Sequence, residues 1–389
     1  MSGPLLYLVA GEPSGDRLGG ALMTALTEAS PGIRFAGVGG QAMRAAGLTS
    51  LFDMADLTVM GLTEVLPRLP TILSRLHQTT TEVIERQPAA LITIDAPSFG
   101  LRVAARVRAK APRIRTIHYV APSVWAWRPG RARHMARFVD HVLALLPFEP
   151  PHMEAAGMSC DFVGHPIAGQ PQISDDAVRA WRADAGLSPE ARLLLVAPGS
   201  RRGELARLGP VFGATVTELA ARQDHVHAVL PVAETVIAEA MALAQSLPVP
   251  ITLIPPDADA TTKRTAFAAA DTALVSSGTI ALEMAAAGTP HVSCYRVSAL
   301  TAAIARRLIR VETGHLVNLV LGEPIVPERM QEACTPEQIL PLLEAILAGG
   351  SEAATQRAAF ERTLVALGRG GPDPAARAAA SVLAQLDSS

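Results

Sequence analysis

The sequence predicts an α/β fold of two doubly wound, Rossmann-like domains. Three observations support this prediction: the length of the chain, a strand–helix alternation that runs twice, and a break between the two runs. With 389 residues, the chain is too long for one hydrophobic core and suits two domains of ordinary size. Alternation of this kind gives parallel sheets with right-handed crossovers. We therefore expect a GT-B-type architecture, in which the two domains face each other across a cleft that holds the active site.

Short apolar or β-branched segments mark the strands of both runs. In the first half they are Leu5–Ala10, Arg34–Val38, Ala90–Ile94, Arg115–Val120, His141–Leu145 and Cys160–Val163. In the second half they are Arg192–Ala197, His227–Leu230, Ile251–Ile254, Thr272–Ser276 and His291–Tyr295. Glycine and proline in the segment Gly164–Pro171 interrupt both the helical and the strand pattern of apolar residues, and so predict the linker. The predicted domains therefore span residues 1–168 and 169–366, and residues 367–389 form a helix that packs on the first domain or on a partner subunit.

Composition excludes several classes of protein. A hydrophobic fraction of 49% and a net charge of −2 indicate a globular chain with no general attraction to nucleic acid. Cys160, Cys294 and Cys334 are isolated, which favours a reduced, cytosolic protein without a structural zinc site. The apolar run from Leu5 to Gly11 follows no basic region and is predicted to be a strand, not a signal peptide. No stretch reaches the length of a transmembrane helix.

The strand ending at Ser276 leads directly into a helix predicted from Ile280 to Ala287. Between them, Ser277, Gly278 and Thr279 form a turn where a phosphate can approach the backbone and meet the free N–H groups of the first helical turn. Glu283 follows one turn later, where its carboxylate can accept two hydrogen bonds from a ribose diol. This arrangement predicts a site for a nucleoside diphosphate. The alternative is that serine and threonine only cap the helix.

A second loop of the phosphate-binding type follows the strand Arg192–Ala197. It contains Gly199, Ser200, Arg201 and Glu204. Ser200 and the neighbouring N–H groups can hold phosphate, and Arg201 can bind it bidentately. Two such loops in one domain favour nucleotide binding over capping.

The first domain carries acidic residues at its strand ends. Glu12 and Asp16 stand where a dinucleotide fold would have its glycine-rich loop, and their charge would repel a pyrophosphate. Asp16 either caps its helix or, like Glu12, faces a sugar hydroxyl. Asp95 follows the strand Ala90–Ile94 and is either a general base or a turn residue ahead of Pro97.

The pair Asp257 and Asp259 has the form of a metal-binding DxD motif. A helix is predicted to begin directly after it, so capping is the favoured interpretation. Because Arg201 and a helix dipole can neutralise a departing diphosphate, we expect no metal and no cofactor.

Basic residues dominate the chain between Asp95 and Asp140, where no acidic residue occurs. They are Arg102, Arg106, Arg108, Lys110, Arg113, Arg115, Arg128, Arg131, Arg133 and Arg137. Trp125 and Trp127 are interleaved with them, and the apolar, proline-punctuated segment Val59–Leu73 lies upstream. This pattern predicts attachment to a lipid surface, with the upstream segment as an acyl-chain groove or a dipping helix. The alternative is that the tryptophans pack in the core and the arginines solvate a helix face; nucleic-acid binding has little support.

Several motifs together resemble the lipid-A-disaccharide synthase family, the inverting glycosyltransferases of bacterial lipid A. They are Val9–Asp16, Val59–Gly61, Ile94–Pro97, Ile117–Arg128, Leu145–Glu149, Phe162–His165, Pro198–Arg201 with Glu204, Ser277–Glu283 and Tyr295–Arg296. The resemblance covers nearly the whole chain. The tryptophan-bearing segment and the first-loop hexapeptide are its most specific parts.

The resemblance implies transfer of 2,3-diacylglucosamine from UDP-2,3-diacylglucosamine to 2,3-diacylglucosamine 1-phosphate, with a β(1→6) bond formed and UDP released. It implies a peripheral protein on the cytoplasmic face of the inner membrane, and points to a homodimer. Carried onto this chain, it also implies substrate contacts by Ser14, Gly15, Ser98, His118, Trp125, Arg128 and Asn318.

The chain departs from the family pattern near the expected base. Family members commonly have a second aspartate where this chain has Ser98, another polar position is Gly100, and an expected Pro-Asn pair reads Val317–Asn318. We expect Asp95 to act as the base, with Asp16 and Glu12 as the other candidates. Two rival functions stay open: a non-hydrolysing UDP-sugar 2-epimerase on the same frame, and a catalytically weakened nucleotide- or lipid-binding relative.

Overall fold

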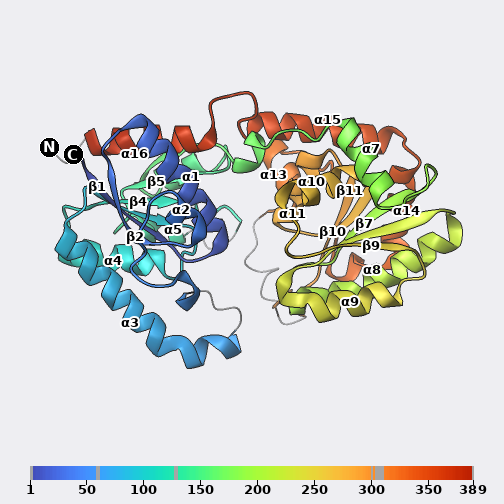
Figure 1. The fold of residues 1–389 in the computed structure, drawn as a ribbon, viewed down its shortest axis with the longest axis horizontal. Coiled ribbons are helices and arrows are strands. Elements are labelled where there is room, and N and C mark those ends of the chain that lie inside the picture. Colours follow the sequence, from blue (N-terminus) through green and yellow to red (C-terminus); the bar gives the residue numbers. More distant parts are fainter. Residues whose placement is uncertain (1–2, 58–61, 127–129, 299–300, 303–310, 388–389) are drawn as a thin grey trace. The chain divides into compact units, whose positions relative to one another are not determined.

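The computed structural model describes residues 3–57, 62–126, 130–298, 301–302 and 311–387. The chain divides into two compact units, residues 1–169 with 367–389, and residues 170–366. Each unit contains a six-stranded parallel sheet with helices on both faces (Figure 1). This architecture confirms the predicted α/β class with two Rossmann-like domains. Among the described helices, none combines the length and apolarity needed to cross a membrane.

The first unit has the strand order β2-β1-β3-β4-β5-β6. Its strands are β1 (Leu5–Ala10), β2 (Arg34–Val38), β3 (Ala90–Ile94), β4 (Arg115–Tyr119), β5 (His141–Ala144) and β6 (Ser159–Phe162). Because β1 lies between β2 and β3, the strand order reverses there. The loops that follow β1 and β3 therefore meet at a topological switch point, where ligands bind in open α/β sheets.

Side chains of the first sheet alternate between two helical layers. Leu6 and Leu8 pack towards α1 (Pro13–Ala29) and α16 (Pro374–Asp387), whereas Tyr7 and Val9 pack in the cluster on the opposite face. The remaining helices of the unit are α2 (Gln41–Ala45), α3 (Leu62–Arg86), α4 (Gly100–Lys110), α5 (Gly130–Met135) and α6 (Pro150–Glu154). Burial on both faces explains why these strands read as continuous apolar runs.

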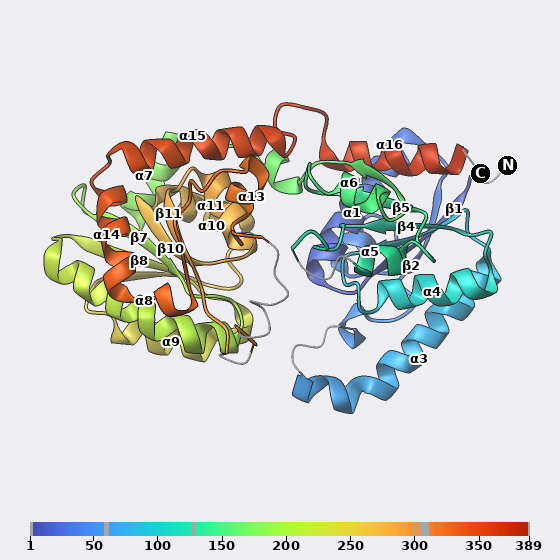
Figure 2. The same ribbon diagram turned by 180° about the vertical axis from the view of Figure 1, so that it is seen from behind.

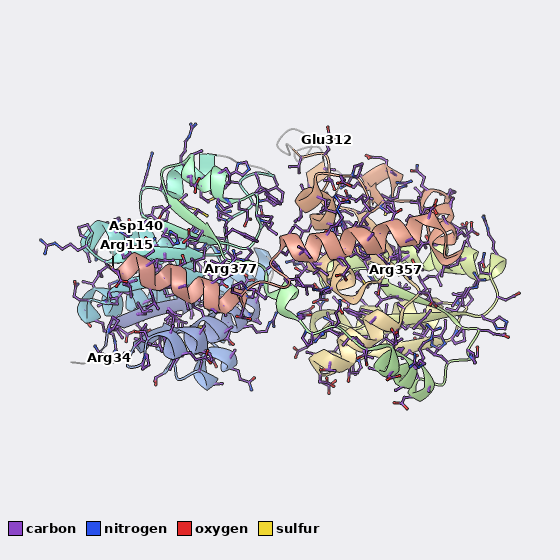
Figure 3. The ribbon with its side chains drawn as sticks, turned by 90° about the horizontal axis from the view of Figure 1, so that it is seen from above. Arg34, Arg115, Asp140, Glu312, Arg357 and Arg377 are labelled. Carbon is purple, nitrogen blue, oxygen red and sulfur yellow. The ribbon has the colours of Figure 1, made fainter. Side chains whose placement is uncertain are left out.

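Helix α16 comes from the end of the chain but belongs to the first unit. Ser381 Oγ lies 2.8 Å from Nε2 of His141, and the Arg377 guanidinium donates to the carbonyl of Phe162. Arg115 of β4 donates to Gln385, and Figure 3 shows the labelled Arg115 beside this helix, which carries Arg377. These contacts fix α16 to the sheet of the first unit.

The second unit has the strand order β12-β11-β10-β7-β8-β9. Its strands are β7 (Arg192–Ala197), β8 (Val226–Pro231), β9 (Ile251–Ile254), β10 (Thr272–Ser276), β11 (His291–Tyr295) and β12 (Glu328–Met330). The helices among its described residues are α7 (Asp175–Asp184), α8 (Arg202–Arg222), α9 (Ile237–Ser246), α10 (Ala260–Ala269), α11 (Thr279–Ala287), α13 (Leu316–Leu321), α14 (Pro336–Leu347) and α15 (Ser351–Ala366). The order reverses at β7, so the loops after β7 and β10 meet at the second switch point.

Eleven strands lie within one residue of the predicted bounds, and β12 was not predicted. The prediction for the fourth strand ran one residue too far, because Val120 has a positive φ of 81° and leaves the strand geometry. Short 3₁₀ turns occur at Met54–Asp56, Pro166–Gly169, Glu234–Val236 and Gln331–Ala333. The 3₁₀ turn at Pro166–Gly169 lies within the segment predicted to be the linker.

Candidate functional site

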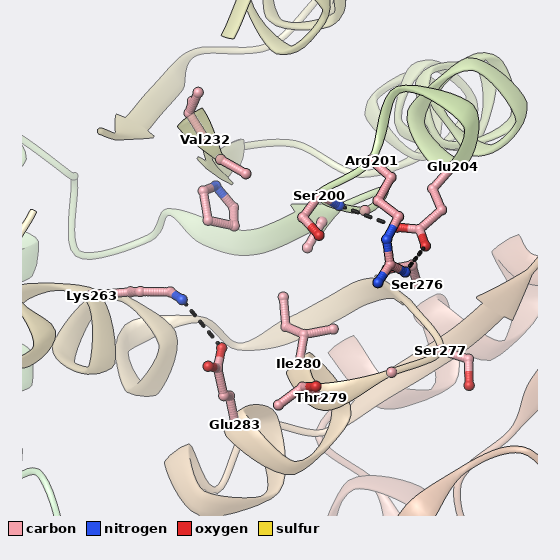
Figure 4. A pocket seen from close by; sticks show the side chains of 15 residues that line it. Ser200, Arg201, Glu204, Val232, Lys263, Ser276, Ser277, Thr279, Ile280 and Glu283 are labelled. Atoms are coloured by element: carbon pink, nitrogen blue, oxygen red, sulfur yellow. Dashed lines mark hydrogen bonds and ion pairs between the residues drawn. The ribbon is translucent and has the colours of Figure 1, made fainter. Parts of the chain in front are cut away.

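A pocket of about 340 Å³ lies at the carboxyl ends of β7, β8 and β10 in the second unit (Figure 4). It is lined by Ala197, Gly199, Ser200, Arg201, Glu204, Pro231, Val232, Ala233, Lys263, Ser276, Ser277, Gly278, Thr279, Ile280 and Glu283. The structure thus brings together every residue that the sequence predicted for the two phosphate-type loops of this domain. Val232 and Lys263 are further lining residues that the sequence did not single out.

The loop after β7 is closed by its own glutamate. Glu204 accepts from the Ser200 N–H through Oε2 (3.3 Å) and from the Arg201 guanidinium through Oε1 (3.0 Å). Gly199 has φ +125°, and a Cβ there would lie 2.6 Å from Oε2 of Glu204, so only glycine fits. Arg201 keeps 74% of its side chain exposed. The loop therefore presents a held but accessible guanidinium to an anion.

The loop after β10 leaves the start of α11 uncapped by any side chain. Gly278 is the N-cap residue of α11, and within the described part of the chain no side-chain hydrogen bond caps this helix. The alternative that serine and threonine serve as caps here is therefore wrong. Ser277 instead directs its hydroxyl to the carbonyl of Gly314 at 3.4 Å. First-turn amides without a side-chain cap, together with the helix dipole, form an anion-binding arrangement.

Glu283 lies on α11, one turn beyond the phosphate-type loop. Its Oε2 is 3.4 Å from Nζ of Lys263 on the neighbouring helix α10, and its side chain is 32% exposed (Figure 4). Composition offered one signal for Lys263, since it and Lys110 are the only lysines in a chain whose other basic side chains are arginines. The carboxylate is thus held at the pocket while it remains open to a ligand.

Asp259 belongs to the N-terminus of α10. Its Oδ1 accepts from the backbone N–H groups of Thr261 (2.8 Å) and Thr262 (2.9 Å), and its Oδ2 accepts from the Thr262 hydroxyl. The prediction that this acidic pair marks a helix cap is confirmed for Asp259. Across the described residues, no group of three or more His, Cys, Asp or Glu side chains is arranged to hold a metal ion.

In the first unit, the loops after β1 and β3 meet at Asp95. The Ser14 hydroxyl donates to Oδ2 of Asp95 at 2.7 Å. Gly15 permits this approach, because a Cβ there would lie 3.0 Å from the carbonyl of Ile94. Asp95 and Ala96 have φ values of +49° and +36°. Left-handed geometry costs a non-glycine residue about 1–2 kcal/mol, and such strain gathers at functional sites.

Asp16 has a structural partner that the sequence did not suggest. Its Oδ1 accepts from the N–H groups of Gly40 (2.7 Å) and Met43 (3.1 Å), and its Oδ2 accepts from Ala42 (2.8 Å). The buried carboxylate therefore caps α2, and the prediction that Asp16 caps its own helix or faces a sugar is wrong. This removes Asp16 from the candidate bases and leaves Asp95 and the exposed Glu12.

Two side chains predicted to contact substrate have internal partners instead. His118 is buried in β4 with Nδ1 2.8 Å from Thr93 Oγ1, and burial together with the nearby Arg131 lowers its pKa to about 4. Asn318 is buried too. Its amide oxygen accepts from the backbone N–H groups of Ile325 and Val326 and so holds the segment that follows α13. Neither side chain is placed to touch a substrate directly.

The remaining predicted contacts divide between exposed, packed and undescribed residues. Ser98 is exposed on the loop after β3. Trp125 is half-buried, with its ring edge-on to Phe148 at 5.1 Å and its Nε1 donating to Glu149 at 3.3 Å. Arg128, Trp127 and the motif Val59–Gly61 lie outside the described residues.

Glu149 is the buried partner that anchors Trp125. Its other oxygen accepts from the Leu146 N–H at 3.0 Å. Burial outweighs these hydrogen bonds and raises the pKa of Glu149 to about 7. Since an unfolded glutamate titrates near 4.3, the folded state holds a proton between these pH values that the unfolded state has lost. Stability should therefore fall as pH rises from about 4.5 to about 7, and level off above.

We expect Glu149→Gln to remove this pH dependence. The wild-type free energy of unfolding of the first unit should fall by on the order of 3 kcal/mol between pH 5 and pH 7.5 on account of Glu149. Urea unfolding at the two pH values measures it. The control is Glu154→Gln, since Glu154 is an exposed glutamate of α6, the helix that Glu149 precedes as N-cap residue. The same pH slope in Glu149→Gln and wild type would contradict the prediction.

Solved structures with similar folds include a UDP-GlcNAc 2-epimerase and MurG. UDP-GlcNAc 2-epimerase from Neisseria meningitidis bound to UDP-GlcNAc superposes with a TM-score of 0.65 at 12% identity, over 99% of this chain and 100% of that one. MurG from Acinetobacter baumannii gives a TM-score of 0.53 at 14% identity, over 99% of both chains. At these identities, the likeness establishes the fold alone.

Sequence comparison is more specific. A family model described as lipid-A-disaccharide synthetase matches residues 6–380. The chain is 51% identical to lipid-A-disaccharide synthase of Ruegeria pomeroyi, over 98% of this chain and 95% of that protein. It is 50% identical to the enzyme of the same name from Rhodospirillum centenum, over 97% and 94%. Since the family model and these relatives span nearly the entire chain, the protein belongs to the lipid-A-disaccharide synthase family of glycosyltransferases.

Proposed function

We propose that this glycosyltransferase transfers 2,3-diacylglucosamine from UDP-2,3-diacylglucosamine to the 6-hydroxyl of 2,3-diacylglucosamine 1-phosphate. A β(1→6) bond forms with inversion at the anomeric carbon, and UDP leaves. The observation that carries the proposal is the pocket of the second unit, where two phosphate-type loops and a carboxylate converge in a member of this family. It is the arrangement that a UDP-linked donor requires.

The donor half of the reaction is assigned to this pocket. The uncapped amides at the start of α11 and the Arg201 guanidinium hold the diphosphate, and Glu283 accepts from the ribose hydroxyls. As the bond between the anomeric carbon and the phosphate oxygen breaks, negative charge grows on UDP. Donors already aimed at that position stabilise it without reorganising.

The acceptor half is assigned to Asp95. The acceptor oxygen bonds to the anomeric carbon while its proton passes to a carboxylate within hydrogen-bond reach. Asp95 directly follows β3, at the end of the sheet where ligands bind in this kind of fold. The Ser14 hydroxyl donates to Oδ2 of Asp95 and holds the carboxylate in place. Ser98 stands where the family pattern has an aspartate, and a hydroxyl cannot serve as base without a partner that activates it.

The acylated substrates require access to a lipid surface, and helix α3 of the first unit supplies the apolar contact. Leu69 and Leu73, one turn apart on α3, are 39% and 44% exposed. Helix α4 runs beside α3 in both views and carries exposed Arg102, Arg106 and Lys110 (Figures 1 and 2). A helix with exposed apolar side chains that packs against a helix with exposed cationic ones suits the headgroup boundary of an anionic membrane. We place the protein peripherally on the cytoplasmic face of the inner membrane.

We expect the protein to float with anionic vesicles at low salt and to be released at high salt. Each basic residue near such a surface contributes about 1 kcal/mol, and salt screens the attraction. Flotation of the Leu69→Ser/Leu73→Ser variant should be clearly weaker. The matched control is Ile237→Ser/Met241→Ser, which removes two similarly exposed apolar side chains from α9. Equal loss in both variants, or no binding by wild type, would contradict this attachment site.

The proposed reaction is tested by incubating the protein with UDP-2,3-diacylglucosamine and 2,3-diacylglucosamine 1-phosphate. We expect disaccharide 1-phosphate and UDP in equal amounts, and no conversion when the acceptor is omitted. An isomerised UDP-sugar without acceptor would indicate the epimerase. UDP binding without any turnover would indicate a catalytically weakened relative.

A further inference from the structure

We propose that Lys263 is a positioning residue of the nucleotide site, which acts by holding Glu283 towards the ribose. This inference rests on the proposed function, because it presupposes a UDP-linked donor in the pocket of the second unit. The sequence motifs that indicated the nucleotide site do not include Lys263. Its role follows from its place in the pocket, its partners and the charge balance there.

The side chain of Lys263 is anchored on its own helix before it reaches Glu283. Its Nζ lies 5.3 Å from the ring centroid of the buried Phe267, one turn later on α10. Asp259 caps the start of the same helix, one turn earlier, and so fixes the backbone that carries the lysine. From this anchored position, Nζ extends into the pocket and forms an ion pair with Oε2 of Glu283 at 3.4 Å (Figure 4).

Charge in the pocket is balanced by two ion pairs. Arg201 pairs with Glu204 at 3.0 Å, and Lys263 pairs with Glu283 at 3.4 Å. Among the described residues that line the pocket, these four are the charged ones. A UDP group brings negative charge to this site. Without Lys263, the negative charge of Glu283 would lie uncompensated beside an anionic ligand. Electrostatic repulsion would then turn the Glu283 carboxylate away from the ribose.

The choice of lysine suits a carboxylate that has to bind a diol at the same time. An ammonium is a point charge that satisfies one carboxylate oxygen, whereas a guanidinium fork engages both. The ion pair uses Oε2 of Glu283. An arginine at position 263 would compete with the ribose hydroxyls for the second oxygen, although arginine is the usual basic residue of this chain.

The test compares UDP with 2′-deoxy-UDP by isothermal titration calorimetry. The variant is Lys263→Met, which keeps the length of the stem and removes the charge. The control is Arg264→Met, which loses the same charge from the next residue of α10, where the guanidinium donates to the carbonyl of Pro171, away from the pocket. Thermal melting checks that both variants are folded.

We expect Lys263→Met to weaken UDP binding by about two- to fivefold, the range for a partly exposed ion pair. It should weaken 2′-deoxy-UDP binding clearly less, because that ligand keeps only one of the two hydroxyls from which Glu283 accepts. Arg264→Met should match wild type with both ligands. Equal losses for UDP and 2′-deoxy-UDP would overturn the proposal, because the lysine would then act on the diphosphate directly. No loss with either ligand would overturn it too. A wild-type protein that fails to bind UDP would instead refute the proposed nucleotide site.

Discussion

Asp95→Asn should lower turnover by roughly two to four orders of magnitude while UDP affinity persists. The substitution keeps the shape of the side chain and removes its basicity. Asparagine also tolerates the left-handed backbone that Asp95 adopts at φ +49°. The Ser14 hydroxyl can still donate to the amide oxygen, so the loop should keep its structure. Single-turnover kinetics with saturating donor and acceptor measure the chemical step directly.

Two further variants decide which residue carries the proton. Ser14→Ala removes the hydrogen bond to Asp95 without removing the base, and should cost no more than about tenfold in turnover. Ser98→Asp restores the carboxylate that the family pattern has at this exposed position. Near-normal turnover in Asp95→Asn would reassign the role to Glu12. Higher activity in Ser98→Asp than in wild type would indicate a base that this chain has replaced.

Arg201→Ala and Glu283→Ala should each weaken UDP binding by about 2 kcal/mol, close to thirtyfold in the dissociation constant. The arginine loses a charge-assisted contact with the diphosphate, and the glutamate loses two hydrogen bonds to the ribose. Calorimetric titration with UDP measures both. The control is Arg202→Ala, since this neighbouring arginine pairs with Glu239 and does not line the pocket. Unchanged affinity in Arg201→Ala and Glu283→Ala would refute the assignment.

The strands could be predicted because most of them are buried on both faces. All five residues of β3, Ala90–Ile94, are buried, and a short apolar run of this kind is typical of a parallel strand covered by helices. Strand β12 escaped prediction because its three residues, Glu328–Met330, are half-buried and two of them are charged. It forms because it can pair with β11, a long-range contact that the local sequence does not reveal.

The two phosphate-type loops were also within reach of sequence analysis. Each is a local structure in which a strand, a glycine and a helix follow one another within a few residues. Asp16 was misassigned because distance along the chain hides its partners. Asp16 binds amides 24 to 27 residues away, at the start of α2. A carboxylate next to a glycine-containing loop suggested that Asp16 binds a ligand. In the fold, its hydrogen-bond partners are backbone N–H groups instead.

Helix α16 has a consequence for the order in which the protein can fold during synthesis. The first unit needs Ala378 and Val382 of this helix to complete its core, yet residues 170–366 emerge from the ribosome before them. The second unit is continuous in sequence and can close as soon as it has emerged. The unit that is begun first is therefore finished last, which reverses the usual N-to-C order of domain folding. Until residues 367–389 arrive, one face of the first sheet stays partly uncovered.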